Sequence, residues 1–191
     1  MFRSGSIQSH LTLRDKIFSL DLTLTICIFL IGIISFFAMY STDGGQFAYH
    51  TKSHIIRFII FFTLFFVISF IKTSFWYGSA TLFYLGVLFL LILVKYVGLT
   101  SSGSQRWLDL YFLNLQPSEL MKIGLILFLA KYYHKISSGD VNKFRYLAQP
   151  LLALLFPVIL VITQPDLGTS FLIAVGGVIV VWLAGVKMKF F

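Results

Sequence analysis

The residues from Leu22 to Tyr40 form an apolar run that contains no charged side chain. A helix that crosses a membrane needs about 20 mostly apolar residues, at roughly 1.5 Å of rise per residue. Strands of a membrane barrel would be about ten residues long and would alternate in polarity, which this run does not do. The run therefore predicts a membrane-spanning α-helix.

Five further segments have a similar apolar character. With the first, they predict an all-α, polytopic membrane protein with six transmembrane helices in a single membrane domain over residues 1–191. Composition agrees, because 58% of the residues are hydrophobic and 12% are charged, against about 25% charged in ordinary soluble domains. The five segments are Ile55–Ile71, Phe75–Val97, Pro117–Tyr133, Gln149–Thr163 and Gly168–Val186.

The net charge of +8 would suggest a nucleic-acid partner in a soluble protein, so its distribution along the chain matters. With six helices alternating in direction, ten basic residues fall on the side of both termini and five on the other side. Cytoplasmic loops carry the excess of Lys and Arg, so both termini are predicted to be cytoplasmic and no nucleic-acid partner is expected. The ten are Arg3, Arg14, Lys16, Lys72, Lys131, Lys135, Lys143, Arg145, Lys187 and Lys189, and the five are Lys52, Arg57, Lys95, Arg106 and Lys122. The basic N-terminus with the first helix is interpreted as an uncleaved signal anchor.

A polar segment on the predicted outer side runs from Gly103 to Lys122. Apolar residues alternate with polar or interfacial ones in its first half, which favours an extended segment at the membrane surface. Arg106 can make paired, charge-assisted hydrogen bonds to phosphate oxygens. It could equally serve as an interfacial anchor for any lipid headgroup, and this residue alone leaves both interpretations open.

Glu119 and Lys122 are three residues apart after Pro117, which suits the first turn of a helix. They therefore share one helix face. An ionisable pair at membrane depth is expected to face a protein interior or a watery cavity. The alternative is a structural ion pair that only neutralises itself.

A second polar segment, Gln164–Ser170, is predicted to form a tight turn between the last two helices. Asp166 can cap the following helix through its side chain, or it can pair with Arg106 or Lys122. The spacing favours the cap. His50 and His54 lack a nearby third ligand, and the single Cys27 lies in an apolar run, so no metal site is predicted from these residues.

Two motifs identify a family. The run GSQRWLDL followed by LQPSELMKI, and then QPDLGTS at the expected distance, strongly resemble the SEDS family of shape, elongation, division and sporulation proteins. The resemblance is greatest to its rod-shape-determining branch and covers essentially the whole chain. It implies a ten-helix bacterial inner-membrane enzyme that polymerises lipid II into glycan strands during cell elongation. It also implies a class B penicillin-binding protein, a transpeptidase, as partner.

The resemblance places several side chains in the polar central cavity of the family. Arg106 and Lys122 are then assigned to binding the substrate pyrophosphate, with Glu119 and Asp166 orienting these cations. Gln116 and Gln164 join them as supporting residues. A divalent cation is left open as a cofactor, and no metal ligand is assigned.

The resemblance also implies that the essential aspartate of the family lies in an external loop after the seventh helix. The chain is therefore expected to be an N-terminal fragment without the catalytic base, inactive by itself. A lipid II flippase and a non-catalytic scaffold of the elongation machinery are the alternative functions, because the same cations could guide a headgroup across the membrane. The branch within the family, elongation, division or sporulation, is not fixed by these residues.

Overall fold

The computed structural model describes residues 20–101, 104–109, 114–137, 139–187 and 190. The basic residues of the predicted signal anchor, and Lys189, lie outside these residues. The chain divides into two compact units, Met1–Thr73 and Ser74–Phe191, and each is described by itself. The single membrane domain expected from the sequence stays a prediction.

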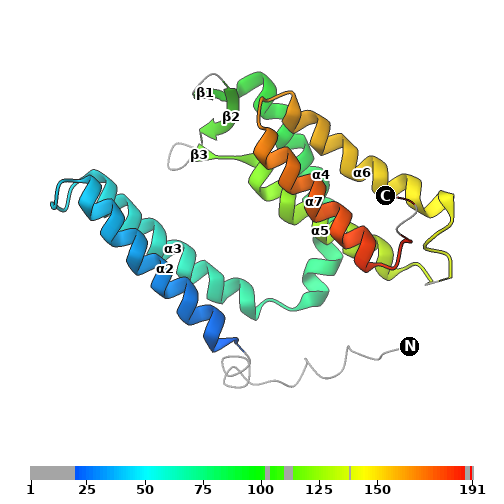
Figure 1. Ribbon diagram of the computed structural model, residues 1–191, viewed down its shortest axis with the longest axis horizontal. Coiled ribbons are helices and arrows are strands. Elements are labelled where there is room, and N and C mark those ends of the chain that lie inside the picture. The colour runs from blue at the N-terminus through cyan, green and yellow to red at the C-terminus, as the bar shows by residue number, and fades with distance from the viewer. Residues whose placement is uncertain (1–19, 102–103, 110–113, 138, 188–189, 191) are drawn as a thin grey trace. The chain divides into compact units, whose positions relative to one another are not determined.

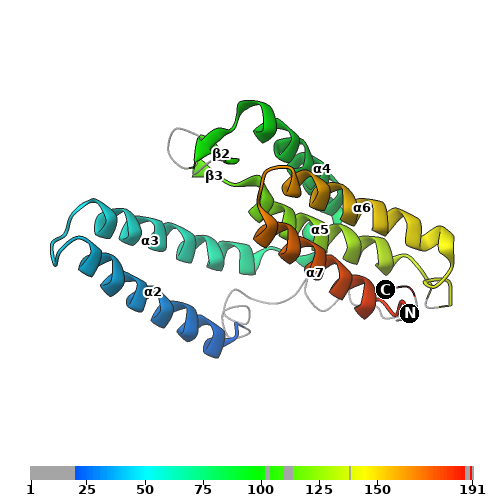
Figure 2. The ribbon, with the colours of Figure 1, turned by 45° about the horizontal axis from the view of Figure 1, so that its top comes forward.

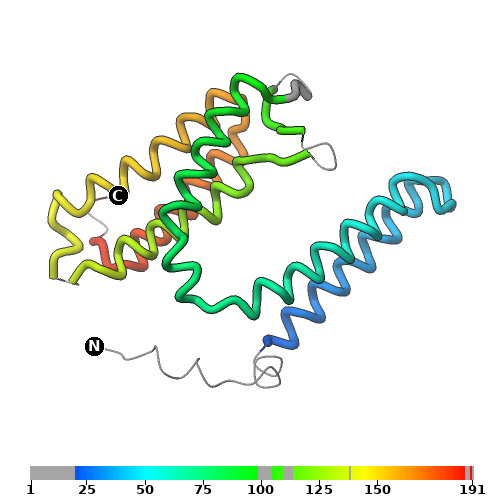
Figure 3. Tube along the Cα trace, turned by 180° about the vertical axis from the view of Figure 1, so that it is seen from behind, coloured from blue at the N-terminus to red at the C-terminus, as the bar shows by residue number. Residues whose placement is uncertain are grey.

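The first unit is a hairpin of two helices, α2 (Leu22–Thr42) and α3 (Tyr49–Phe70), which run side by side (Figure 3). Asp21 caps α2, because its Oδ1 accepts a hydrogen bond from the backbone N–H of Leu24 at 3.1 Å. Gly32 allows the two helices to approach closely, since a Cβ at this position would lie 2.2 Å from the ring of Phe58. The hairpin therefore depends on a small residue at this crossing.

Asp43 closes the connection between α2 and α3. Its Oδ2 accepts hydrogen bonds from the backbone N–H and the hydroxyl of Thr51, both at 2.7 Å, and Thr51 is fully buried. Both hydrogen bonds lower the pKa of the Asp43 carboxyl, and the one from the Thr51 hydroxyl has the larger effect. Gly44 and Gly45 supply the positive φ angles of 69° and 77° that the turn requires.

The second unit contains α4 (Thr73–Val97), which begins at the boundary, together with α5 (Pro117–His134), α6 (Phe144–Ile162) and α7 (Leu167–Leu183). Helix α7 packs against both α5 and α6 (Figure 1). Gly177 permits this packing, because a Cβ there would lie 2.5 Å from Leu154 and 3.1 Å from Leu125. The main hydrophobic core lies between these helices and consists of Tyr84, Val87, Leu91, Met121, Leu125, Leu129, Leu154, Val161 and Ile173.

A three-stranded antiparallel sheet connects α4 to α5, in the order β1 (Leu99–Ser101), β2 (Ser104–Asp109) and β3 (Asn114–Leu115). The extended segment expected from the alternating pattern is therefore the strand β2. The strand pairing itself was not predicted, because pairing partners are not evident from one alternating segment.

The all-α, polytopic architecture predicted from the sequence is confirmed, with six helices in the described residues. Of these, α2, α3, α4 and α6 are long and apolar enough to cross a membrane. Helix α7 is apolar but has 17 residues, and α5 carries Glu119, Lys122 and Lys131. Some boundaries differ from the expected ones: α3 begins at Tyr49 instead of 55, α6 at Phe144 instead of 149, and α7 ends at Leu183 instead of 186.

Two prolines interrupt the hydrogen bonding of α6, and two tyrosines compensate for them. Pro150 and Pro157 are buried inside the helix, and a proline removes the N–H that would bond to the carbonyl four residues earlier. Those carbonyls belong to Tyr146 and Ala153. The hydroxyl of Tyr132 on α5 donates to the first at 3.2 Å, and that of Tyr84 on α4 donates to the second at 2.8 Å.

We expect Tyr84→Phe to lower the free energy of unfolding by about 1 kcal/mol, because the partly buried carbonyl of Ala153 would lose its donor. Tyr96→Phe is a matched control on the same helix, since Tyr96 is exposed. Both variants would be compared by reversible unfolding in detergent. Equal losses in the two variants would contradict the role given to the Tyr84 hydroxyl.

Candidate functional site

Arg106 is positioned by the small sheet. Strand β2 pairs with β3 through Leu108 opposite Leu115, and β3 ends directly before Gln116, the N-cap residue of α5. Residues two apart on a strand share one face, so Arg106 lies on the same face as the buried Leu108. Strand β2 contacts α5, and the side chain of Arg106 keeps 29% of its surface exposed.

Asp166 is the centre of a polar cluster at the start of α7. It is buried, at 7% exposure. Its Oδ1 accepts a hydrogen bond from the backbone N–H of Thr169 at 3.2 Å. Its Oδ2 accepts one from Nε2 of Gln116 at 3.1 Å and lies 3.4 Å from Nη1 of Arg106. The turns before α5 and α7 meet at this end of the unit, near β2 and β3 (Figure 2).

Both interpretations of Asp166 therefore hold. The sequence favoured a helix cap and left open a pairing with Arg106 or Lys122, and the structure shows the cap together with the Arg106 pair. One carboxylate makes both interactions, because its two oxygens face different partners. A buried carboxylate needs such partners, and the arrangement fixes the guanidinium of Arg106 at the start of α7.

Lys122 pairs with Glu119, with 2.8 Å between Nζ and Oε2. This is the pair expected from the three-residue spacing on one helix face. Lys122 keeps 27% of its side-chain surface exposed and Glu119 keeps 53%, so the pair lies at the surface of the described chain. Glu119 is in the first turn of α5, where the helix dipole favours a negative charge.

Gln164 has a different contact from the one expected for a cavity residue. It is buried, and its Nε2 donates a hydrogen bond to the backbone carbonyl of Leu91 at 3.1 Å. Gln164 therefore joins the end of α6 to α4 and holds the turn that carries Asp166. The polar cavity implied by the resemblance stays a prediction.

Two buried serines near the cluster were not singled out from the sequence. Ser118 and Ser170 are 2% and 4% exposed, and the hydroxyl of Ser170 donates to the carbonyl of Leu167 at 2.8 Å. Both lie inside the motifs LQPSELMKI and QPDLGTS. A small polar residue directly after a predicted helix start was the signal that could have indicated them.

Within the described residues, no three His, Cys, Asp or Glu side chains come close enough together to hold a metal ion. Nε2 of His54 is buried without a hydrogen-bond partner among these residues, and its ring stacks on Phe58. Cys27 is exposed. The divalent cation left open from the sequence is not assigned to any residue.

The helices define a polytopic helical membrane protein that gathers ionisable side chains at one end of its second unit. The family model described as "Cell cycle protein", for FtsW, RodA and SpoVE, matches residues 16–191. The chain belongs to this family, which is the SEDS family expected from the motifs.

Curated relatives of the chain support its membership of this family. The chain is 30% identical to a probable peptidoglycan glycosyltransferase FtsW of Buchnera aphidicola subsp. Baizongia pistaciae, over 87% of this chain and 45% of the relative. It is also 30% identical to the peptidoglycan glycosyltransferase MrdB of Escherichia coli K12, over 93% and 47%. The chain thus spans about half the length of the curated relatives it matches.

Solved structures show the same fold. The rod shape determining protein RodA of Thermus thermophilus matches with a TM-score of 0.77 and 28% identity, over 90% of this chain and 56% of that one. A chain from a structure on the coordination of polymerization and crosslinking by a peptidoglycan synthase complex matches with a TM-score of 0.79 and 28% identity. That match covers 90% of this chain and 50% of the other.

Proposed function

We propose that the protein to which this chain belongs is a peptidoglycan glycosyltransferase that polymerises lipid II. The observation that supports this most is the membership of a family whose matched relatives are named peptidoglycan glycosyltransferases. The cluster of Arg106, Gln116 and Asp166 supports it independently, because it presents a partly exposed guanidinium at a helix end. Cations in such a place suit a pyrophosphate group.

In the proposed reaction a sugar hydroxyl of the acceptor attacks the anomeric carbon of the donor sugar. A bond forms between that carbon and the hydroxyl oxygen, the bond to the phosphate oxygen breaks, and undecaprenyl pyrophosphate leaves. The hydroxyl proton passes to a base that is not assigned among these residues. Negative charge grows on the pyrophosphate as it leaves, and Arg106 and Lys122 stabilise it.

Asp166 and Glu119 have a positioning role in this proposal. Each carboxylate lies beside one of the two cations. Gln116 also donates a hydrogen bond to Asp166. A guanidinium carries five N–H donors in a planar fork, so Arg106 can contact a phosphate while it stays paired with Asp166. The partner is proposed to be a class B penicillin-binding protein in the bacterial inner membrane.

The proposal is tested with the protein to which this chain belongs, its transpeptidase partner and labelled lipid II supplied outside sealed liposomes. Glycan strands that form on the outside support the glycosyltransferase. A flippase would instead carry the lipid II headgroup across the bilayer without making polymer. A scaffold would bind the transpeptidase without making polymer and without moving lipid II. Transport without polymer, or binding without polymer, would overturn the proposal.

The membrane orientation gives a separate prediction, from the ten-to-five split of basic residues. Single cysteines at the exposed Asn114 and Ser137 would be introduced into a Cys27→Ser background. We expect an impermeant maleimide to label the cysteine at 114 on intact cells, and the one at 137 only after permeabilisation. The reverse pattern would contradict cytoplasmic termini.

A further inference from the structure

A cavity of about 370 Å³ lies between α6 and α7, away from the Arg106 cluster. Its volume falls in the range of pockets that hold small ligands. It is lined almost wholly by apolar side chains, which come from α6 between Phe144 and Leu154, from the second half of α7, from Tyr133 on α5 and from residues that follow α7. They include Ala148, Leu151, Leu154, Val178, Val181 and Val186. An apolar cavity of this kind accepts a hydrocarbon chain.

Basic side chains lie at the end of the unit where this cavity is found. Arg145 shares a helix face with the lining residue Ala148, three positions later, and it is exposed. Lys187 directly follows the lining residue Val186 and is also exposed. Lys143, the N-cap residue of α6, forms an ion pair with Asp140. The charge at the mouth therefore favours an anionic group.

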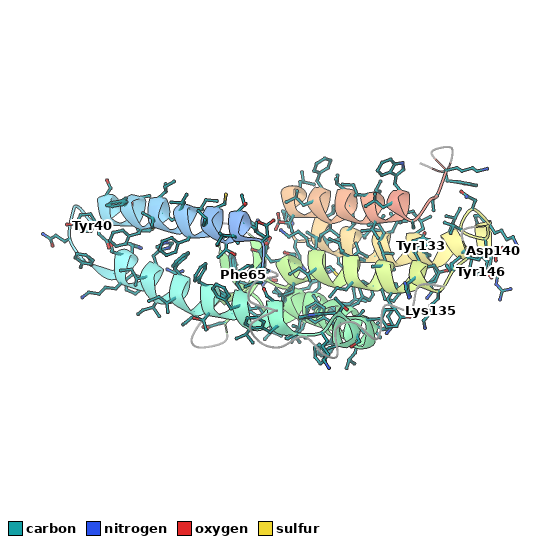
Figure 4. The ribbon with its side chains drawn as sticks, turned by 90° about the horizontal axis from the view of Figure 1, so that it is seen from below. Tyr40, Phe65, Tyr133, Lys135, Asp140 and Tyr146 are labelled. Carbon is teal, nitrogen blue, oxygen red and sulfur yellow. The ribbon has the colours of Figure 1, made fainter. Side chains whose placement is uncertain are left out.

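A buried hydroxyl lies in the same place. Tyr133 lines the cavity and is 8% exposed. In the described part of the chain its hydroxyl has no hydrogen-bond partner, although burying a polar group without a partner costs free energy. Figure 4 shows Tyr133 at the same end of the unit as Lys135, Asp140 and Tyr146. A ligand that carried an acceptor between its charged and apolar parts would satisfy this hydroxyl.

We propose that this cavity binds one anionic phospholipid from the surrounding membrane. One acyl chain lies between α6 and α7, an ester carbonyl accepts a hydrogen bond from Tyr133, and the phosphate lies beside Arg145 and Lys187. An anionic phospholipid carries an apolar chain, an ester carbonyl and a charged phosphate. These match the three features found at the cavity, which are its apolar lining, the buried Tyr133 hydroxyl and the exposed cations.

The proposed site is independent of the glycosyltransferase proposal. Val178 and Val181 lie near the end of α7, whereas Asp166 caps its start, which separates the two places by roughly 20 Å along the helix. The positive-inside rule accounts for Lys and Arg on this side. It does not account for a cavity of this size or for an unpartnered buried hydroxyl.

The test uses the protein purified from membranes in a non-ionic detergent, stripped of lipid and titrated with phosphatidylglycerol or with phosphatidylcholine of the same acyl chains. Native mass spectrometry counts the lipids bound per protein. We expect one phosphatidylglycerol to bind, and phosphatidylcholine to bind roughly tenfold more weakly, because its headgroup carries no net charge.

Three variants separate the parts of the proposed site. Arg145→Gln with Lys187→Gln is expected to lower phosphatidylglycerol binding to the level of phosphatidylcholine. Tyr133→Phe is expected to weaken both lipids by the same factor, because both carry the ester carbonyl. Ala148→Trp is expected to abolish binding of both lipids by filling the cavity.

Matched controls lie outside the cavity lining. Lys72→Gln removes an exposed cation of the first unit, and Ile159→Trp enlarges an exposed residue of α6; neither should change lipid binding. If Ala148→Trp lowers the helix content measured by circular dichroism, the smaller Val178→Phe replaces it. Unchanged lipid binding in the filled variant, or equal binding of the two lipids by the unsubstituted protein, would overturn the proposal. A dimer that the filled variant abolishes would assign the cavity to a second copy instead.

Discussion

Replacing Arg106 by alanine in the protein to which this chain belongs is expected to slow glycan polymerisation by roughly 30- to 1,000-fold, which corresponds to about 2–4 kcal/mol of lost transition-state stabilisation. The reason is that the guanidinium would no longer stabilise the charge that grows on the pyrophosphate. Arg106→Lys should also be impaired although it keeps the charge, because an ammonium group cannot make the planar, paired contact. Polymerisation rates on purified lipid II at equal expression provide the measurement.

Arg57 offers a matched control for this experiment. It is an arginine on α3 whose Nε donates to the carbonyl of Ser53 at 3.0 Å, in an exposed position, and it lies on the same predicted side of the membrane. Arg57→Ala and Arg57→Lys should leave the rate unchanged. If Arg106→Ala polymerises lipid II at the rate of the unsubstituted protein, the residue is an interfacial anchor and the assignment fails.

Asp166→Ala is expected to cause the second large effect, a loss of about 2–4 kcal/mol in the free energy of unfolding. Removing one member of a buried ion pair leaves the other charge uncompensated, and the partial exposure of Arg106 reduces that penalty. The helix cap on Thr169 contributes about 1 kcal/mol of the loss. Reversible unfolding of the protein in detergent measures the change.

Two further variants separate the contribution of the ion pair from that of the helix cap. Asp166→Asn keeps an N-cap of similar strength but removes the charge, so it should show the loss of the ion pair alone. Asp21→Ala removes a cap from α2 at an exposed position, and it should cost only about 1 kcal/mol. A loss at Asp166→Ala no larger than at Asp21→Ala would show that the Arg106 pair adds nothing to stability.

The helices could be predicted because crossing a membrane requires long apolar segments, and the sequence contains them. Their boundaries were less predictable, because a helix can continue through polar residues at the membrane surface without placing those side chains in the apolar part of the membrane. Helix α3 begins at Tyr49, where the segment before Ile55 includes two histidines, a lysine and a serine. The early start of α6 at Phe144 likewise includes Arg145.

The polar cluster was only partly predictable. The Glu119–Lys122 pair follows from spacing within one helix, since residues three positions apart lie next to each other on a helix face. The contact of Asp166 with Arg106 and Gln116 joins segments far apart in the sequence, and no local pattern specifies which of them meet. For the same reason the sequence could not show that Gln164 would bond to Leu91.

The tyrosine hydroxyls that replace missing backbone donors in α6 also constrain how the family can change its sequence. While Pro157 is present, Tyr84 supplies the hydrogen bond that the carbonyl of Ala153 would otherwise lack. Once a residue with an N–H replaces the proline, that N–H can donate to the carbonyl of Ala153 within the helix. Phenylalanine at position 84 then no longer lowers the stability of the protein. The two positions should therefore vary together among relatives, with Tyr84 lost only after the proline, and the same order should hold for Tyr132 and Pro150.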